Sequence, residues 1–154
     1  MRIGLLRGAK CAVLVTAGLA LAATSVAVAR PQRIVSLNMC TDELVLRLAD
    51  PERIASVTWL SQDPRNANMA EVARRIPANH GVVEQVLAMK PDLVIAGAYT
   101  TRATVGLLKR VGARPREFGV PRNLAEMRAQ IREMAALLGE EARGEALVAD
   151  IDTR

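Results

Sequence analysis

The chain has 154 residues and carries 21 basic and 16 acidic side chains, which give a net charge of +5. Three of the basic residues lie in an amino-terminal segment of 29 residues that we expect to be removed, which leaves 18 basic against 16 acidic side chains, or +2. So small an excess of positive charge does not indicate a nucleic-acid-binding protein. The remaining 125 residues are enough for one domain with a single hydrophobic core.

Residues 1–29 have the pattern of a signal peptide. Basic residues at Arg2, Arg7 and Lys10 precede an uncharged apolar stretch, and the segment ends in Ala27-Val28-Ala29, with small side chains where signal peptidase requires them. We therefore expect export and cleavage after Ala29. An uncleaved membrane anchor is the alternative, but the apolar stretch is shorter than the roughly 20 residues of a spanning helix.

Short apolar runs alternate with helix-like stretches along the rest of the chain. The runs are RIVSL (33–37), RIASV (53–57), DLVIAG (92–97) and RPREF (114–118). Strands that alternate with helices predict an α/β fold, in which right-handed crossovers build a parallel sheet flanked by helices. The functional loops of such a sheet gather at the carboxyl ends of its strands.

The first helix is expected to follow the first strand directly. Thr41 can cap it, and Asp42 and Glu43 then lie in the opening turn, beside the positive end of the helix dipole. Pro51 ends the helix, because proline cannot continue it.

Two further helices are expected on either side of the third strand. One is short and ends at Lys90-Pro91-Asp92, and the other spans about 101–111 and ends at Gly112, a natural left-handed terminator. The residues expected to be buried are Val83, Val86 and Leu87 in the first of these helices, and Val105, Leu108 and Val111 in the second.

The fourth long helix has the clearest pattern. Asn123 and Glu126 have the spacing of a capping box, and Gly139 marks the end. Its predicted apolar stripe comprises Leu124, Met127, Ile131, Met134 and Leu138. A last helical pattern follows, with Ala142, Ala146, Leu147 and Ile151 as its expected apolar face. No capping residue or turn signal precedes the final residue. We therefore expect the chain to be the front portion of a longer protein; the alternative is a frayed, exposed tail.

Cys40 and His80 are the only cysteine and histidine that follow the signal segment. One thiol cannot form an internal disulfide, and one thiol with one imidazole cannot complete a tetrahedral zinc site. An enzyme could use Cys40 or a serine as nucleophile with His80 as base. The chain shows no nucleophile elbow, no distinctive carboxylate pair and no phosphate-binding glycine loop, so we do not expect an enzyme.

Scarce side chains cluster just beyond the carboxyl ends of the expected strands. They are Asn38, Met39 and Cys40 after the first strand, Trp59 after the second, Tyr99 after the third, and His80 in the turn before the short helix. Aromatic rings with a few polar neighbours at this edge predict a small-molecule site. The alternatives are that Trp59 plugs the edge of the core and that Cys40 is a small buried loop residue.

Three blocks carry a family resemblance. They are RIVSLNMCTDELVLRLADPERIASVTWLSQDP, NHGVVEQVLAMKPDLVIAG and LLKRVGARPREFGVPRNLAEMRAQI. In this order they resemble the amino-terminal lobe of the periplasmic binding proteins that serve ABC importers for cobalamin, haem and iron siderophores. The resemblance covers residues 33–154, and its most telling block is the acidic helix followed by KPDLV, Glu84 to Val94.

The resemblance implies two Rossmann-like α/β lobes joined by a long rigid helix, with the ligand held between the lobes. Residues 30–139 then correspond to the amino-terminal lobe, and residues 140–154 to the start of the interlobe helix; no second lobe follows. The ligand-facing residues that it implies are Asn38, Met39, Cys40, Trp59, Leu60, Ser61, Tyr99, Thr100 and Arg102. Glu84 corresponds to the carboxylate that relatives present to arginines of the permease.

The function implied is that of a periplasmic solute-binding component of an ABC importer, with the inner-membrane permease as partner and without a catalytic role, a cofactor or a metal site of its own. The ligand is expected to be an iron siderophore, haem or a cobalamin-type corrinoid. Arg65 and Arg102 near the rim leave an anionic ferric siderophore open, and a corrinoid is equally open. The alternative function is that of a single-lobe regulatory or interaction module of the same fold without a transport role.

Overall fold

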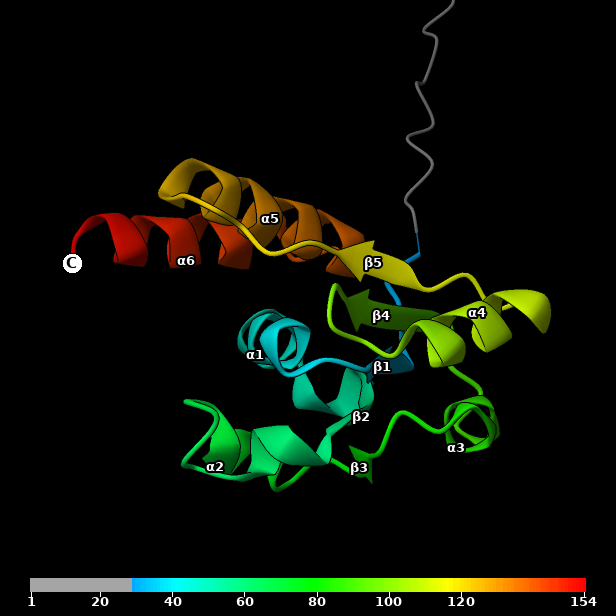
Figure 1. Ribbon diagram of the computed structural model, residues 1–154. Coiled ribbons are helices and arrows are strands. Elements are labelled where there is room, and N and C mark those ends of the chain that lie inside the picture. Colours follow the sequence, from blue (N-terminus) through cyan, green and yellow to red (C-terminus); the bar gives the residue numbers. More distant parts are fainter. Residues whose placement is uncertain (1–28) are drawn as a thin grey trace, which may run out of the picture.

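The computed structural model describes residues 29–154, so the expected signal peptide lies outside the described residues except for Ala29. Five parallel strands form one sheet with the order β3-β2-β1-β4-β5 (Figure 1). The strands are β1 (Ile34–Ser36), β2 (Ile54–Thr58), β3 (Ala78–Asn79), β4 (Leu93–Gly97) and β5 (Arg116–Phe118). The predicted α/β fold with a parallel sheet is confirmed.

Helices cover both faces of this sheet. The helices α1 (Met39–Leu48), α2 (Ala70–Ala73) and α5 (Leu124–Leu138) share a core with the side chains on one face, such as Ile34. The helices α3 (Val83–Ala88) and α4 (Arg102–Arg110) pack on the other face, against Val35 and its neighbours. Because consecutive side chains of a strand point to opposite faces, the central strand β1 is buried on both sides.

The start of α1 differs from the prediction. The helix begins at Met39, two residues before the expected cap Thr41, and Asn38 is the N-cap, because its side-chain oxygen accepts a hydrogen bond from the amide of Cys40 at 3.0 Å. The Thr41 hydroxyl instead donates to the Asn38 carbonyl and shares a hydrogen bond with the Ser36 hydroxyl. Cys40 therefore lies in the first helical turn and is exposed, so the alternative interpretation of Cys40 as a small buried loop residue was wrong.

The expected cap of α5 is confirmed. The side-chain oxygen of Asn123 accepts a hydrogen bond from the amide of Glu126 at 2.8 Å, and Gly139 ends the helix in the left-handed conformation, with φ of 69°. Within the predicted stripe, Ile131, Met134 and Leu138 are buried, whereas Leu124 in the first turn is exposed. The predicted apolar stripe is therefore buried from Ile131 onward but not in the first turn of α5.

Helix α6 (Glu141–Asp152) packs along α5, through a face that agrees with the prediction only in part, since Leu147 and Ile151 are partly buried and Leu147 packs against the core (Figure 1). Ala142 and Ala146 are exposed, while Gly144 and Val148 are buried. A side chain at position 144 would overlap the Ala135 methyl group, so the glycine permits the close approach of the two helices. Close packing at Gly144 therefore orients α6 together with the apolar side chains of Leu147 and Val148.

Four short elements were not predicted: β3, α2 and the 3₁₀ turns η1 (Pro51–Arg53) and η2 (Trp59–Gln62) that flank β2. Two residues expected in the core, Leu87 and Val111, are exposed because each lies in or after the last turn of its short helix. Between Ala29 and Arg154, no helix combines the length and the apolar character needed to cross a membrane.

A buried ion pair, Arg53 with Glu140, joins segments that lie far apart in the sequence. The guanidinium of Arg53 donates to the Glu140 carboxylate at 2.5 Å, to the Pro31 carbonyl at 2.7 Å and to the Leu138 carbonyl at 2.6 Å. Both side chains are less than a tenth exposed. The pair thereby ties the segment before β1 to the junction between α5 and α6.

Candidate functional site

The loops that follow the five strands lie along one edge of the sheet, because all five strands are parallel; we call this edge the carboxyl rim. The chain builds the sheet outward from β1, first through β2 to β3 and then, on the other side, through β4 to β5. The direction therefore reverses between β1 and β4. In open α/β sheets a crevice forms at this reversal and binds ligands.

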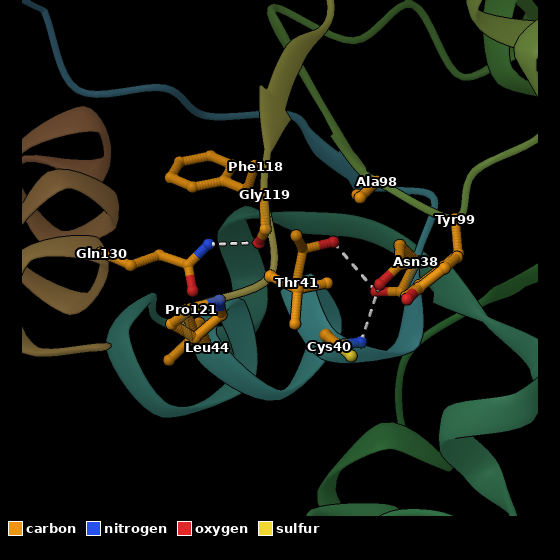
Figure 2. Close-up of a pocket in the computed structure, with 12 residues that line it drawn as sticks. Asn38, Cys40, Thr41, Leu44, Ala98, Tyr99, Phe118, Gly119, Pro121 and Gln130 are labelled. Carbon is orange, nitrogen blue, oxygen red and sulfur yellow. Dashed lines mark hydrogen bonds between the residues drawn. The ribbon is translucent and has the colours of Figure 1, made fainter. Parts of the chain in front are cut away.

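Three predicted site residues, Asn38, Cys40 and Tyr99, meet at this reversal. Asn38 follows β1 and Tyr99 follows β4, and both line a cavity of about 50 Å³ together with Cys40 and Pro121 (Figure 2). Tyr99 is 81% exposed. Gly97, the last residue of β4, allows this arrangement, since a Cβ there would lie 2.5 Å from the Asn38 Cγ atom. The structure therefore brings the loops after β1 and β4 together, as the sequence predicted.

Thr100 supports this crevice from behind rather than lining it. Its hydroxyl donates to the carbonyl of Leu37 at 3.1 Å and accepts from the amide of Gly97 at 3.0 Å. Leu37 follows β1 and Gly97 ends β4, so the hydroxyl ties together the two strand ends on either side of the reversal. Arg102 is the first residue of α4 and is exposed. Together with Thr100 it lines a separate groove beside α4.

The cavity continues into a wider groove of about 530 Å³ between α1, α5 and α6. Cys40, Leu44 and Gln130 line both the cavity and the groove, and the apolar side chains of Met127 and Leu147 form much of the groove wall. Gln130 holds the loop after β5 in place, because its amide donates to the Gly119 carbonyl at 2.8 Å (Figure 2). The loop of residues 119–121 was not predicted as part of the site, because no aromatic or other scarce side chain marks it in the sequence.

The other half of the rim carries two rings. Trp59 follows β2, is 50% exposed and has its ring centroid 5.9 Å from that of His80, with an angle of 32° between the planes. This separation lies within the range of attractive aromatic pairs. Leu60 beside Trp59 is also exposed. The half-exposed Trp59 does not plug the core, and His80 joins it on the rim.

Ser61 lies differently from its expected role. It is 1% exposed, and its hydroxyl donates to the Asp42 carboxylate at 2.6 Å. The same carboxylate oxygen, Oδ2, accepts from the amide of Thr58 at 2.9 Å and from its hydroxyl at 2.5 Å. Ser61 therefore holds the turn in place and presents no side chain to a ligand.

The Asp42 carboxylate is itself fully buried, and its second oxygen, Oδ1, has no hydrogen-bond partner among the described residues. Burial raises the pKa of Asp42 above its ordinary value, while the hydrogen bonds from serine and threonine hydroxyls and from the Thr58 amide oppose the shift. The prediction from sequence placed Asp42 in the first turn of a helix but not in the interior. It becomes buried because the turn after β2 folds over it.

Asn79 is a second buried polar residue beneath the rim, and sequence reasoning missed it as well. Its amide donates to the Ser36 carbonyl and to the Ser56 hydroxyl, both at 2.9 Å, and its oxygen accepts from the Gly81 amide at 3.1 Å. These bonds fix the turn on which His80 lies. Within residues 29–154, no group of three or more histidine, cysteine or acidic side chains lies close enough together to hold a metal ion.

Comparison with solved structures finds the same fold in periplasmic binding proteins. A haem-binding protein from Roseiflexus sp. RS-1 aligns with a TM-score of 0.65 and 26% identity, over 79% of this chain and 46% of its own. The vitamin B12-binding protein BtuF of Vibrio cholerae aligns with a TM-score of 0.64 and 22% identity, over 80% and 48%. A possible iron-binding protein of Staphylococcus epidermidis aligns with a TM-score of 0.68 and 19% identity, over 81% and 49%.

The chain thus spans less than half the length of these structures. No curated protein sequence gives a match. The model of the periplasmic binding protein family matches residues 34–154, which is most of the chain and all of the sheet with its rim. The chain therefore belongs to the periplasmic binding protein family.

Proposed function

We propose that this chain supplies the amino-terminal wall of a ligand site in a periplasmic solute-binding component of an ABC importer, and that the ligand is a metal chelate of the iron siderophore, haem or corrinoid kind. The observation that carries the proposal is the crevice at the reversal of the sheet, between Asn38 and Tyr99, in a member of this family. The ligands of the similar structures, haem, vitamin B12 and iron, support the ligand class.

The chemistry of the rim fits such a ligand. Trp59, Leu60 and Tyr99 offer exposed apolar surface, Asn38 and His80 offer polar groups, and the exposed guanidinium of Arg102 offers a positive charge. Small-molecule sites combine a mostly apolar lining with a few polar groups that fix the orientation. Met39, the first residue of α1, is partly exposed between Asn38 and Cys40. The signal-peptide pattern and the family together support a periplasmic location.

A titration of the chain with ferrichrome, haemin and cyanocobalamin tests the proposal. Each of these compounds absorbs light and should quench Trp59, the only tryptophan, when bound at the rim. We expect one of them to quench Trp59 saturably, and Tyr99→Ala to weaken that binding by about tenfold, which corresponds to about 1.4 kcal/mol. Val111→Ala, an exposed apolar residue after the last turn of α4, is the control and should leave the affinity unchanged. Absence of binding by all three compounds in equilibrium dialysis would contradict the proposal.

We further propose that Glu84 docks on the permease. It is exposed in the first turn of α3, on the face of the sheet opposite to α1 and α5, and its carboxylate can pair with a basic side chain of a partner. Charged pairs at an interface set orientation and association rate. We expect Glu84→Lys to slow ligand uptake by cells that carry the importer and to leave ligand affinity unchanged. Glu52→Lys is the control. Glu52 is an exposed glutamate in η1, just before β2, and so lies at the end of the sheet opposite to the carboxyl rim. Equal losses of uptake in both variants would contradict the docking role.

A further inference from the structure

The turn that carries Trp59 is bracketed by the two residues that bind Asp42. Thr58 precedes Trp59 and Ser61 follows Leu60, and both hydroxyls and the Thr58 amide donate to the single oxygen Oδ2 of Asp42. The 3₁₀ turn η2 has no side-chain cap of its own, and the Thr58 hydroxyl that precedes it donates to the Asp42 carboxylate. Asp42, which lies in α1, thus anchors both ends of the turn through Thr58 and Ser61.

The pairing of β2 with β3 places the second ring beside the first. Thr58 and Asn79 are register partners, so Trp59 and His80 are the next residues along two neighbouring parallel strands. Asn79 fixes the His80 side through its bonds to Ser36, Ser56 and Gly81, and the Gln85 side chain accepts from the His80 amide at 3.1 Å. Strand pairing alone ends at residues 58 and 79, so the position of the indole beyond that point depends on the turn.

We propose that Asp42 is the positioning residue for Trp59, and that its buried carboxylate holds the indole against the His80 imidazole so that the ligand meets a preformed pair of rings. The role of the ring pair in ligand binding rests on the proposed function. The geometry of the ring pair does not rest on it and can be tested without a ligand. A preformed pair spares the ligand the entropic cost of ordering the turn.

The chain offers an unambiguous probe, since it has one tryptophan and one histidine. In the nuclear magnetic resonance spectrum, the His80 ring protons should show cross-relaxation with the Trp59 ring and a shift caused by the ring current of the indole. The Trp59→Leu variant lacks the indole, so the difference between the parent and this variant gives the size of the ring-current shift. We expect Asp42→Ala to lose the cross-relaxation and most of this shift, and to make Trp59 more accessible to acrylamide. Asp42→Asn should retain both signals, because the amide oxygen, with two lone pairs, can still accept hydrogen bonds from Thr58 and from Ser61.

Asp63→Ala is the matched control. Asp63 follows the same turn, but among the described residues its side chain accepts hydrogen bonds only from Arg65. It should therefore leave the ring signals unchanged. Should Asp42→Ala fail to fold, the double variant Thr58→Val with Ser61→Ala removes both hydroxyl donors and keeps the carboxylate, and should lose the same signals. Protection of the β1 and β4 amides from exchange establishes that each variant is folded.

Two results would overturn the inference. Retention of the ring signals in folded Asp42→Ala would show that β2–β3 pairing suffices, and loss of the signals in Asp42→Asn or Asp63→Ala would show that they do not depend on the hydrogen bonds to Asp42. A chain that binds none of ferrichrome, haemin and cyanocobalamin but still shows the ring signals, with their loss in Asp42→Ala, would overturn the proposed function and leave the positioning role standing.

Discussion

Gly97 shows at the residue scale how closely the crevice is packed. A Cβ at this position would lie 2.5 Å from Cγ and 2.7 Å from Oδ1 of Asn38. We expect Gly97→Ala to displace the Asn38 side chain, to weaken the cap of α1 and to lower the free energy of unfolding by about 1 to 3 kcal/mol. Gly106→Ala is the control, because nothing lies within 4 Å of a Cβ there. Urea denaturation of both variants checks the prediction, and equal midpoints would contradict it.

Two aspartates close to the Trp59 turn should respond to pH with opposite signs. Burial raises the pKa of Asp42 above 3.8, so between the unfolded and folded values the folded state binds more protons and the unfolding free energy falls as pH rises. The hydrogen bonds from Arg65 lower the pKa of Asp63 to about 2, so its contribution is present above pH 3.8 and is lost as pH falls toward 2.

Differences between variant and parent isolate each carboxylate. We expect the stability of Asp42→Asn relative to the parent to increase as pH rises above about 4, and that of Asp63→Asn to decrease as pH rises from about 2 to 4. Asp63 is on the surface, so its effect should be small and should shrink in high salt. Chemical denaturation from pH 2 to 7 provides the measurement. Parallel pH curves for Asp42→Asn and its parent would show that Asp42 has an ordinary pKa.

The sequence predicted the residues of the rim better than those beneath it. Trp59 and Tyr99 follow apolar runs that could be recognised as strands, so their place at the carboxyl edge followed from the fold. Ser61 and Asp42 could not be recognised as partners, because their hydrogen bond joins two elements and leaves no periodic pattern. In the sequence, a buried aspartate in the first turn of a helix cannot be distinguished from an exposed one that simply interacts favourably with the helix dipole.

At the scale of elements, long and periodic segments were predictable and short ones were not. Helix α5 has 15 residues, an Asn123 cap and a glycine end, all of which are visible in the sequence. Strand β3 has two residues and is set by pairing with β2, so no local pattern marks it. The face of α6 was predicted only in part, because Gly144 contributes to packing by its small size and a pattern of apolar side chains does not reveal it.

The junction of α5 and α6 should depend strongly on the buried Arg53–Glu140 pair. Glu140→Ala leaves the Arg53 guanidinium buried without its counter-charge, which we expect to cost about 3 to 5 kcal/mol of unfolding free energy. Glu145→Ala is the control, since it breaks the exposed pair with Arg132 and should cost at most about 1 kcal/mol. Both values come from denaturant titrations. Similar losses in the two variants would mean that burial adds nothing to the pair.

At the scale of the whole molecule, the site that we propose on the rim is open to solvent. The crevice between Asn38 and Tyr99 measures about 50 Å³, and the adjoining groove is open, whereas well-formed sites cover about 70 to 90% of a small ligand's surface. In the alignments, this chain covers only 44 to 49% of the similar solved structures.

We therefore expect this chain alone to bind its ligand weakly, with a dissociation constant in the micromolar range or above, which corresponds to no more than about 8 kcal/mol. The low affinity should result from fast dissociation, because an uncovered ligand can leave without any movement of the protein. Stopped-flow measurement of Trp59 fluorescence with the compound that binds gives both rate constants, and cyanocobalamin with the Vibrio cholerae BtuF protein is a two-sided reference. Nanomolar, stoichiometric binding by the monomeric chain would contradict this expectation, and would mean that the rim and the groove between α1, α5 and α6 enclose the ligand by themselves.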